Sequence, residues 1–181
     1  MGHPQRPGKE PKTREAFIAQ FGTNYDKLMN SVKRQTAGKE YDTVTFVWMQ
    51  GESDSGKSTD IYFESFDRIV ARLKSDLEVE SMNIVIGRLS DYGGEKWTKF
   101  RDRQVKYAEE HPNCEWINTD DLNDKVKDDS TVQNDLHYTE EGYKILAERF
   151  AEKAIVLIGK QEGVNAPKAF SRGTIKHLSR P

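Results

Sequence analysis

Cysteine is nearly absent from this sequence, and so are long hydrophobic runs and any large excess of charge. Cys114 is the single cysteine in 181 residues, which excludes an internal disulfide and a cysteine-rich metal site. No apolar run approaches the about 20 residues that a membrane-spanning helix needs. The opening residues 1–8 lack an apolar core, so they do not form a secretory signal. A net charge of −2 argues against a general nucleic-acid-binding surface.

The composition is consistent with one domain between two polar ends. Hydrophobic residues make up 35% and charged residues 32% of the chain, a lean balance that polar ends would explain. Residues 1–13 are rich in proline, glycine and basic side chains, so we expect a disordered arm. Residues 160–181 are predicted to form a basic flexible tail, because periodicity is lost there and basic residues dominate. The domain itself then spans residues 14–159.

Strand-like and helix-like patterns alternate along this domain, which predicts an α/β fold with a parallel sheet and helices on both faces, a three-layer arrangement. The predicted strands cover residues 43–49, 82–86 and 114–118. Apolar residues three or four positions apart predict three helices, which begin near Thr13, near Ser58 or Thr59, and near Lys96. A last helix is predicted with Thr139 as its N-cap and with Tyr143 on its buried side. A polar loop is expected between Leu122 and Val132.

The first of these strands is expected to be central to the domain. Its sequence, TVTFVWM, is a nearly unbroken β-branched and aromatic run, typical of a strand that is buried on both faces. A polar cluster follows at once: Gln50, Gly51, Glu52, Ser53 and Asp54. In open α/β sheets the carboxyl ends of the strands are where ligands bind. An ordinary polar turn is the alternative interpretation, because turns also collect glycine, serine and aspartate.

The same region also satisfies a phosphate-binding pattern. Residues 51–58, GESDSGKS, match G-x-x-x-x-G-K-[ST] between a predicted strand and a predicted helix. Two carboxylates, Glu52 and Asp54, would however repel phosphate from such a loop. No later strand clearly ends in the aspartate that would hold magnesium, and Asp120-Asp121 is a weak substitute. A nucleotide-binding protein stays as an alternative.

Three separated segments resemble blocks of the sialate O-acetylesterase-like carbohydrate esterases, a family of the SGNH (GDSL-like) hydrolases. They lie in the same order as in that family, and the similarity spans roughly residues 27–154. The segments are WMQGESD at 48–54, RDRQ at 101–104 with NTDDL at 118–122, and NDLHYTEEGY at 134–143. The resemblance implies a three-layer SGNH or flavodoxin-like fold. If it holds, the match of residues 51–58 to the phosphate-binding pattern is a coincidence.

The resemblance also implies hydrolysis of an acetyl ester on a sugar by a serine, a histidine and oxyanion donors. His137 would be the general base. The family places an aspartate three residues before this histidine, where the chain has Asn134, so either Asp135 supports His137 or the histidine lacks its usual partner. Gln50 would be a donor to the substrate or the oxyanion. The residues expected to line the pocket are Gln50, Gly51, Glu52 and Asn134, and no metal or other cofactor is implied.

The family's nucleophile motif, Gly-Gln-Ser-Asn, does not occur in the sequence. The block that supplies an oxyanion-hole glycine is also missing, and Ser53, Ser55 and Ser90 lie on no recognisable nucleophile turn. We therefore expect a C-terminal portion of such an esterase that lacks its first strands and is catalytically incomplete. A non-catalytic, sugar-binding relic of the fold is the alternative. The cellular compartment is not predicted, because a signal could lie in the missing part.

A missing first strand has a physical consequence for the strand at residues 43–49. Its outer edge would carry unpaired backbone N–H and C=O groups beside apolar side chains. We therefore expect an isolated chain of poor stability, or one that associates with itself through this edge.

Overall fold

The computed structural model describes residues 22–127, 130–132 and 135–161. Residues 1–13, most of 160–181 and Asn134, for which the sequence made predictions, lie outside these ranges. The elements in chain order are α2 (Thr23–Thr36), β1 (Thr45–Trp48), α3 (Thr59–Asp76), β2 (Asn83–Gly87), α4 (Glu95–Glu110), β3 (Cys114–Ile117), β4 (Lys125–Lys127), β5 (Ser130–Val132) and α5 (Glu140–Gln161).

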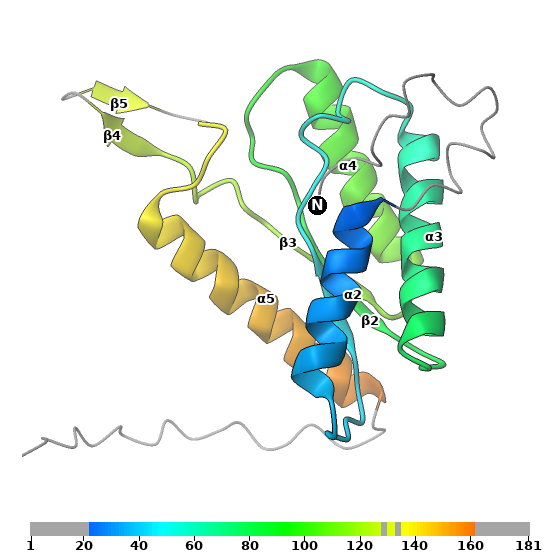
Figure 1. Ribbon diagram of the computed structural model, residues 1–181. Helices are drawn as coiled ribbons and strands as arrows, with labels where there is room; N and C mark the ends of the chain where they lie inside the picture. Colours follow the sequence, from blue (N-terminus) through cyan, green and yellow to red (C-terminus); the bar gives the residue numbers. More distant parts are fainter. Residues whose placement is uncertain (1–21, 128–129, 133–134, 162–181) are drawn as a thin grey trace, which may run out of the picture.

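A three-stranded parallel sheet forms the middle layer, in the order β1-β2-β3. Phe46 is opposite Ile84, and Ile84 is opposite Cys114, so side chains of one parity from all three strands share one face. Helices lie on both sides of the sheet, with α5 on one side and α3 and α4 on the other (Figure 1). The predicted α/β fold with a parallel sheet between helices is therefore confirmed.

One face of the sheet is covered by an aromatic core. Phe46, Trp48, Ile84 and Ile86 from the strands pack with residues of α2, α3 and α4. The rings lie close together: the centroids of Trp48 and Phe66 are 5.1 Å apart and those of Phe63 and Tyr107 are 4.7 Å apart, so much of this core is aromatic. The buried helix residues are Met29, Phe63, Phe66, Leu73, Tyr107 and Ala108. We call this side of the sheet the aromatic face.

The opposite face is covered by α5 alone among the described elements. Val85 and Ile117 of the sheet pack with Leu146, Phe150 and Leu157 of α5. The helix also reaches the outer strand, because Lys153 and Lys160 both form ion pairs with Glu115 of β3. We call this side the α5 face, and its cover lies over β2 and β3.

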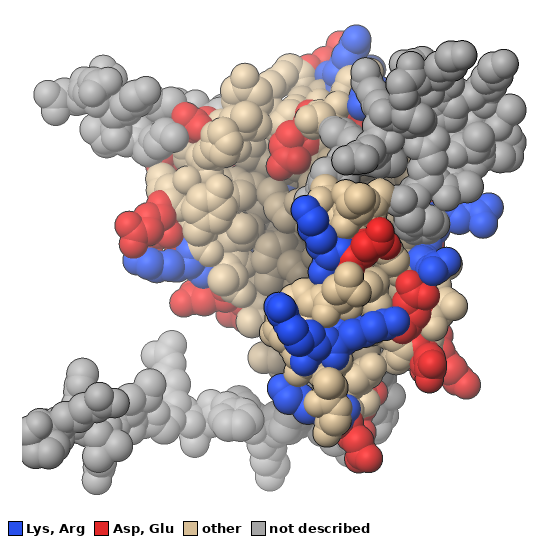
Figure 2. All heavy atoms as spheres, in the orientation of Figure 1, with Lys and Arg blue, Asp and Glu red and all other residues tan. Residues whose placement is uncertain are grey.

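On the α5 face no described element covers β1, which corrects the prediction that this strand is buried on both sides. Val47 is 47% exposed, while its neighbour Phe46 is 9% exposed. Tyr143, predicted to be buried, is 51% exposed, and Ile155 of α5 is 65% exposed. The surface between α5 and α2 carries few charges and is hollowed (Figure 2). We refer to the exposed side of β1 at Val47 as the uncovered strip.

Three further differences from the sequence predictions concern the ends and loops. The predicted polar loop after Leu122 contains an antiparallel hairpin of β4 and β5. The first described helix begins at Thr23, and the residues before Gly22 lie outside the described part. Gly38 follows the end of this helix with a φ of +71°, a conformation that favours glycine. Among the described helices, none is long and apolar enough to span a bilayer.

Candidate active site

The carboxyl ends of the three parallel strands meet at one rim of the sheet. Gln50 follows β1, Leu89 follows β2, and Thr119 follows β3. Thr119 is completely buried, and its hydroxyl donates to the carbonyl oxygens of Arg88 at 2.8 Å and Leu89 at 3.2 Å. The exits of β2 and β3 are thereby joined. All three exits lie at the top of the molecule in Figure 1.

The exits of β1 and β2 are joined through Gln104 of α4, which is only 1% exposed. Its Nε2 donates to the carbonyl of Gln50 at 3.2 Å, and its Oε1 accepts the N–H of Leu89 at 3.0 Å. The hydroxyl of Tyr62 also donates to the Gln50 carbonyl, at 2.8 Å. The carbonyl of Gln50 therefore accepts hydrogen bonds from two side chains. The buried amide of Gln104 has a partner for both its NH₂ group and its oxygen, as buried polar groups usually do.

Gly51 is required by the close approach of this turn to the core. Its φ is +140°, and a Cβ at this position would lie 2.3 Å from the ring of Phe100. Its N–H donates to the carboxylate of Glu52 at 3.0 Å. The sequence placed Gly51 and Glu52 in the pocket lining. The structure places Gly51 in the buried floor of the rim and Glu52 on its exposed side.

The side chain of Gln50 points along its own turn. Its Nε2 donates to Asp54 at 3.0 Å, and the other Asp54 oxygen pairs with Lys57 at 2.9 Å. This arrangement also disfavours the phosphate-binding interpretation, because Lys57 is paired with a carboxylate and the N–H of Gly51 is already occupied. The helix α3 begins only after Ser58.

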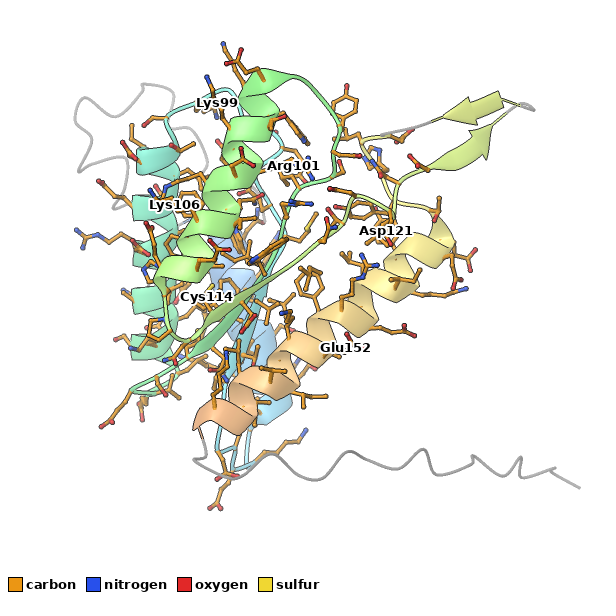
Figure 3. All side chains as sticks on the ribbon, turned by 180° about the vertical axis from the view of Figure 1, so that it is seen from behind. Lys99, Arg101, Lys106, Cys114, Asp121 and Glu152 are labelled. Carbon is orange, nitrogen blue, oxygen red and sulfur yellow. The ribbon has the colours of Figure 1, made fainter. Side chains whose placement is uncertain are left out.

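An arginine–aspartate group lies beside these turns, and the sequence interpretation missed it. Asp120 accepts hydrogen bonds from Arg88, at 2.6 Å, and from Arg101. Arg101 is 9% exposed, and its Nε donates to the carbonyl of Leu89 at 2.9 Å. Figure 3 shows Arg101 on α4 directed toward the strand ends. Asp120, whose side chain is 40% exposed, therefore pairs with two arginines of the rim. The sequence feature that could have indicated this group is the spacing of Arg101 and Gln104, two polar residues about one helical turn apart on the same helix.

His137 stands on the exposed side of the segment that leads into α5. Its side chain is 73% exposed, and its Nδ1 lies 4.0 Å from Oδ1 of Asp135. That distance is too long for a hydrogen bond. The same carboxylate oxygen instead accepts the backbone N–H of His137 at 2.8 Å. In the structure Asp135 holds the backbone of His137 rather than its imidazole, and the support of the imidazole by Asp135 stays a prediction.

The segment after His137 is anchored in the fold. Thr139 caps α5 as predicted, since its Oγ1 accepts the N–H of Gly142 at 2.9 Å. Tyr138 is 8% exposed, and burial raises its pKa to about 12. The hydroxyl of Thr119 acts against this rise, and the nearby charge of Glu52 adds to it.

The Gln50–Glu52 turn and the His137 segment lie on the same rim. A Cβ at Gly51 would meet the side chains of Phe100 and Leu89, and Leu136 packs against the same buried group of Leu89, Trp97 and Phe100. The two loops therefore approach a shared apolar centre from two sides. Asn134, the fourth predicted lining residue, lies outside the described residues.

The chain matches the carbohydrate esterases described as sialic acid-specific acetylesterases, over residues 12–156. It belongs to this family. A comparison with curated protein sequences found no significant match.

The fold of this carbohydrate esterase family member is also seen in a protein from Arabidopsis thaliana, whose crystal structure was determined at 1.6 Å resolution. The two chains superpose with a TM-score of 0.59 at 23% identity, over 81% of this chain. The match covers 58% of the plant protein, so this chain spans well under two thirds of its length. At this identity the likeness shows the fold alone.

Two serines of this family member lie in the loops at the carboxyl rim of the sheet, Ser90 after β2 and Ser55 after β1. Ser90, at the exit of β2, is 3% exposed, and its hydroxyl makes a long contact of 3.5 Å to the carbonyl of Leu136. Ser55 donates to the carbonyl of Glu52 at 3.2 Å. Among the described residues, no serine hydroxyl hydrogen-bonds to the His137 imidazole. The described part of this family member also contains no group of three or more histidine, cysteine or acidic side chains that could hold a metal ion.

Proposed function

We propose that this chain carries the base side of an acyl-ester hydrolase site that acts on acetylated sugars. The observation that carries the proposal is the position of His137. It is exposed, lies beside a carboxylate, and shares the carboxyl rim of the sheet with the Gln50–Glu52 turn. Membership of the carbohydrate esterase family supplies the reaction class.

In the proposed reaction, His137 accepts the proton of a serine hydroxyl while the serine oxygen bonds to the acetyl carbon. The proton then passes to the sugar oxygen as the carbon–oxygen bond of the ester breaks. The carboxylate of Asp135, now 4.0 Å from Nδ1, would stabilise the imidazolium that forms between these steps. The side-chain amide of Gln50 would donate to the oxyanion once it leaves Asp54.

We further propose that the chain does not complete this reaction alone. The Gly-Gln-Ser-Asn motif is not in the sequence, and no described serine reaches His137. The chain would then recognise an O-acetylated sugar without turning it over. This property is shared with a non-catalytic relic of the fold, so binding and turnover have to be measured separately.

The test compares the wild-type chain with His137→Ala, using O-acetylated sialic acid, 4-nitrophenyl acetate and a fluorophosphonate that labels activated serines. We expect binding of the sugar to shift the NMR signals of the His137 imidazole, without turnover that depends on His137 and without labelling. His137-dependent turnover that Ser90→Ala abolishes would contradict the proposed incompleteness. The absence of both binding and turnover would reject the esterase proposal, and ATP binding that Lys57→Ala abolishes would favour the nucleotide alternative.

A further inference from the structure

Asn123 is a completely buried polar side chain in the loop after β3. Its Nδ2 donates to Oδ1 of Asp91 at 2.8 Å and to the carbonyl oxygen of Asp135 at 2.6 Å. Both partners are acceptors, so only the NH₂ side of the amide fits between them. Its Oδ1 is buried and has no hydrogen-bond partner among the described residues. The side chain therefore acts as a donor in two directions, at the cost of one unsatisfied acceptor.

These two bonds connect the exits of two strands to the segment that carries His137. Asp91 belongs to the loop after β2, and Asn123 belongs to the loop after β3. Asp135 precedes His137 by two residues. The side chain of Asn123 is thus the place where the strand exits and the His137 segment meet.

The same loop also holds the other end of this segment. The N–H of Thr139, two residues after His137, donates to the carbonyl oxygen of Leu122 at 3.0 Å. Gly142 lies against that carbonyl so closely that a Cβ would be 2.2 Å from its oxygen. Residues 135–139 are therefore fastened to Leu122 and Asn123 on both sides of His137.

We infer that Asn123 is a positioning residue that holds His137 at the rim by clamping the carbonyl of Asp135. The inference rests on the proposed function for the role of His137 as the base. The His137 side chain is mostly exposed, so packing holds it little and its position has to come from the backbone on either side. The carboxylate of Asp135 moves with the same backbone, so one clamp sets both members of the pair.

The test uses the full chain and three variants. Asn123→Ala removes both donated bonds. The double variant Asp91→Asn with Asn123→Asp reverses the bond between positions 91 and 123 but leaves no donor for the Asp135 carbonyl. Asn113→Ala is the matched control, because Asn113 is an exposed asparagine at the opposite end of β3. The measurements are amide hydrogen exchange, the NMR signal of the His137 imidazole, thermal melting, and binding of O-acetylated sialic acid.

In Asn123→Ala we expect the amide of His137 to exchange roughly tenfold faster, the loss expected for about one hydrogen bond. The amides of β2 and the middle of α5 should keep their protection, and the imidazole signal should shift and broaden. The melting temperature of the double variant should lie closer to that of the wild type than the melting temperature of Asn123→Ala does. Its His137 amide exchange and imidazole signal should nevertheless change as they do in Asn123→Ala. Asn113→Ala should leave His137 unchanged.

Two results would show that Asn123 does not clamp the His137 segment. One is unchanged exchange and an unchanged imidazole signal in Asn123→Ala. The other is a double variant that restores the wild-type signal of His137, because the Asp135 carbonyl would then be irrelevant. Sugar binding separates this inference from the function: a wild-type chain that binds no acetylated sugar rejects the proposed function, while the exchange data still decide the clamp. Wild-type binding with equal affinity in Asn123→Ala rejects the positioning role and leaves the function standing.

Discussion

The two faces of the sheet are built from the same three strands and yet differ in their cover. On the aromatic face, residues of α2, α3 and α4 bury Phe46 and Trp48 of β1. On the α5 face, a single helix covers β2 and β3, and Val47 of β1 stays 47% exposed. Adjacent residues of one apolar strand therefore have opposite environments. The difference teaches that an apolar run predicts a strand well, but that the neighbouring elements decide which of its sides is buried.

The largest effect that would sharpen this comparison is expected on the aromatic face. Phe66 of α3 is 1% exposed and packs against Phe46, Trp48 and Tyr107. Phe66→Ala should lower the free energy of unfolding by about 3–5 kcal/mol, because it removes buried area and leaves a cavity. Val47→Ala, on the other side of the same sheet, should change it by less than about 0.5 kcal/mol. Urea denaturation measures both, and equal losses in the two variants would remove the distinction between the faces.

The next effect concerns how α5 is attached to the α5 face. Gly142→Ala would place a Cβ 2.2 Å from the carbonyl oxygen of Leu122, and backbone cannot give way easily there. We expect a loss of about 1–3 kcal/mol in the free energy of unfolding.

Gly159→Ala is the matched control for this substitution. Gly159 lies in the same helix, and a Cβ there would meet no atom within 4 Å. Alanine is the better helix former, so this variant should gain up to about 1 kcal/mol. A loss of similar size at both glycines would show that contact with Leu122 does not matter. Thermal or urea unfolding of the two single variants is sufficient to decide.

Much of the fold follows from the sequence, because local pattern determines strands and helices directly. The three parallel strands and the cap at Thr139 are examples. The exposure of Val47 and Tyr143 does not follow, because burial depends on elements elsewhere in the chain. The hairpin of β4 and β5 was missed because its residues are polar and its strands are short.

For the candidate site, the sequence indicated which loops matter but not how they are connected. Gln50 and His137 were found through residue type and motif, and both lie on the rim. The links between the loops run through Gln104, Asn123 and Asp120, whose partners are far away in the sequence. Such pairs have no local periodicity, so a single sequence does not show them. The spacing of Arg101 and Gln104 on a buried helix face was the one available signal.

The smallest effect on stability is expected in the uncovered strip, where the effect on association should be largest. Val47 lies on β1, an edge strand of the described sheet whose residues 45–48, TFVW, carry no charge. Edge strands without charged side chains favour pairing with a second chain. We therefore expect the chain to self-associate as its concentration rises in sedimentation velocity experiments. Val47→Lys should abolish this association while changing the free energy of unfolding by no more than about 0.5 kcal/mol.

Tyr92→Lys is the control for the association experiment, because Tyr92 is similarly exposed, at 45%, but lies in the loop after β2. Its replacement adds the same charge away from the uncovered strip, so it should leave association as it is in the wild type. A wild-type chain that stays monomeric at all concentrations and melts cooperatively would contradict the expectation. It would mean that the exposed apolar side of β1 is tolerated in water here. The two faces of the sheet would then differ in how they are covered, but this difference would not lead to self-association.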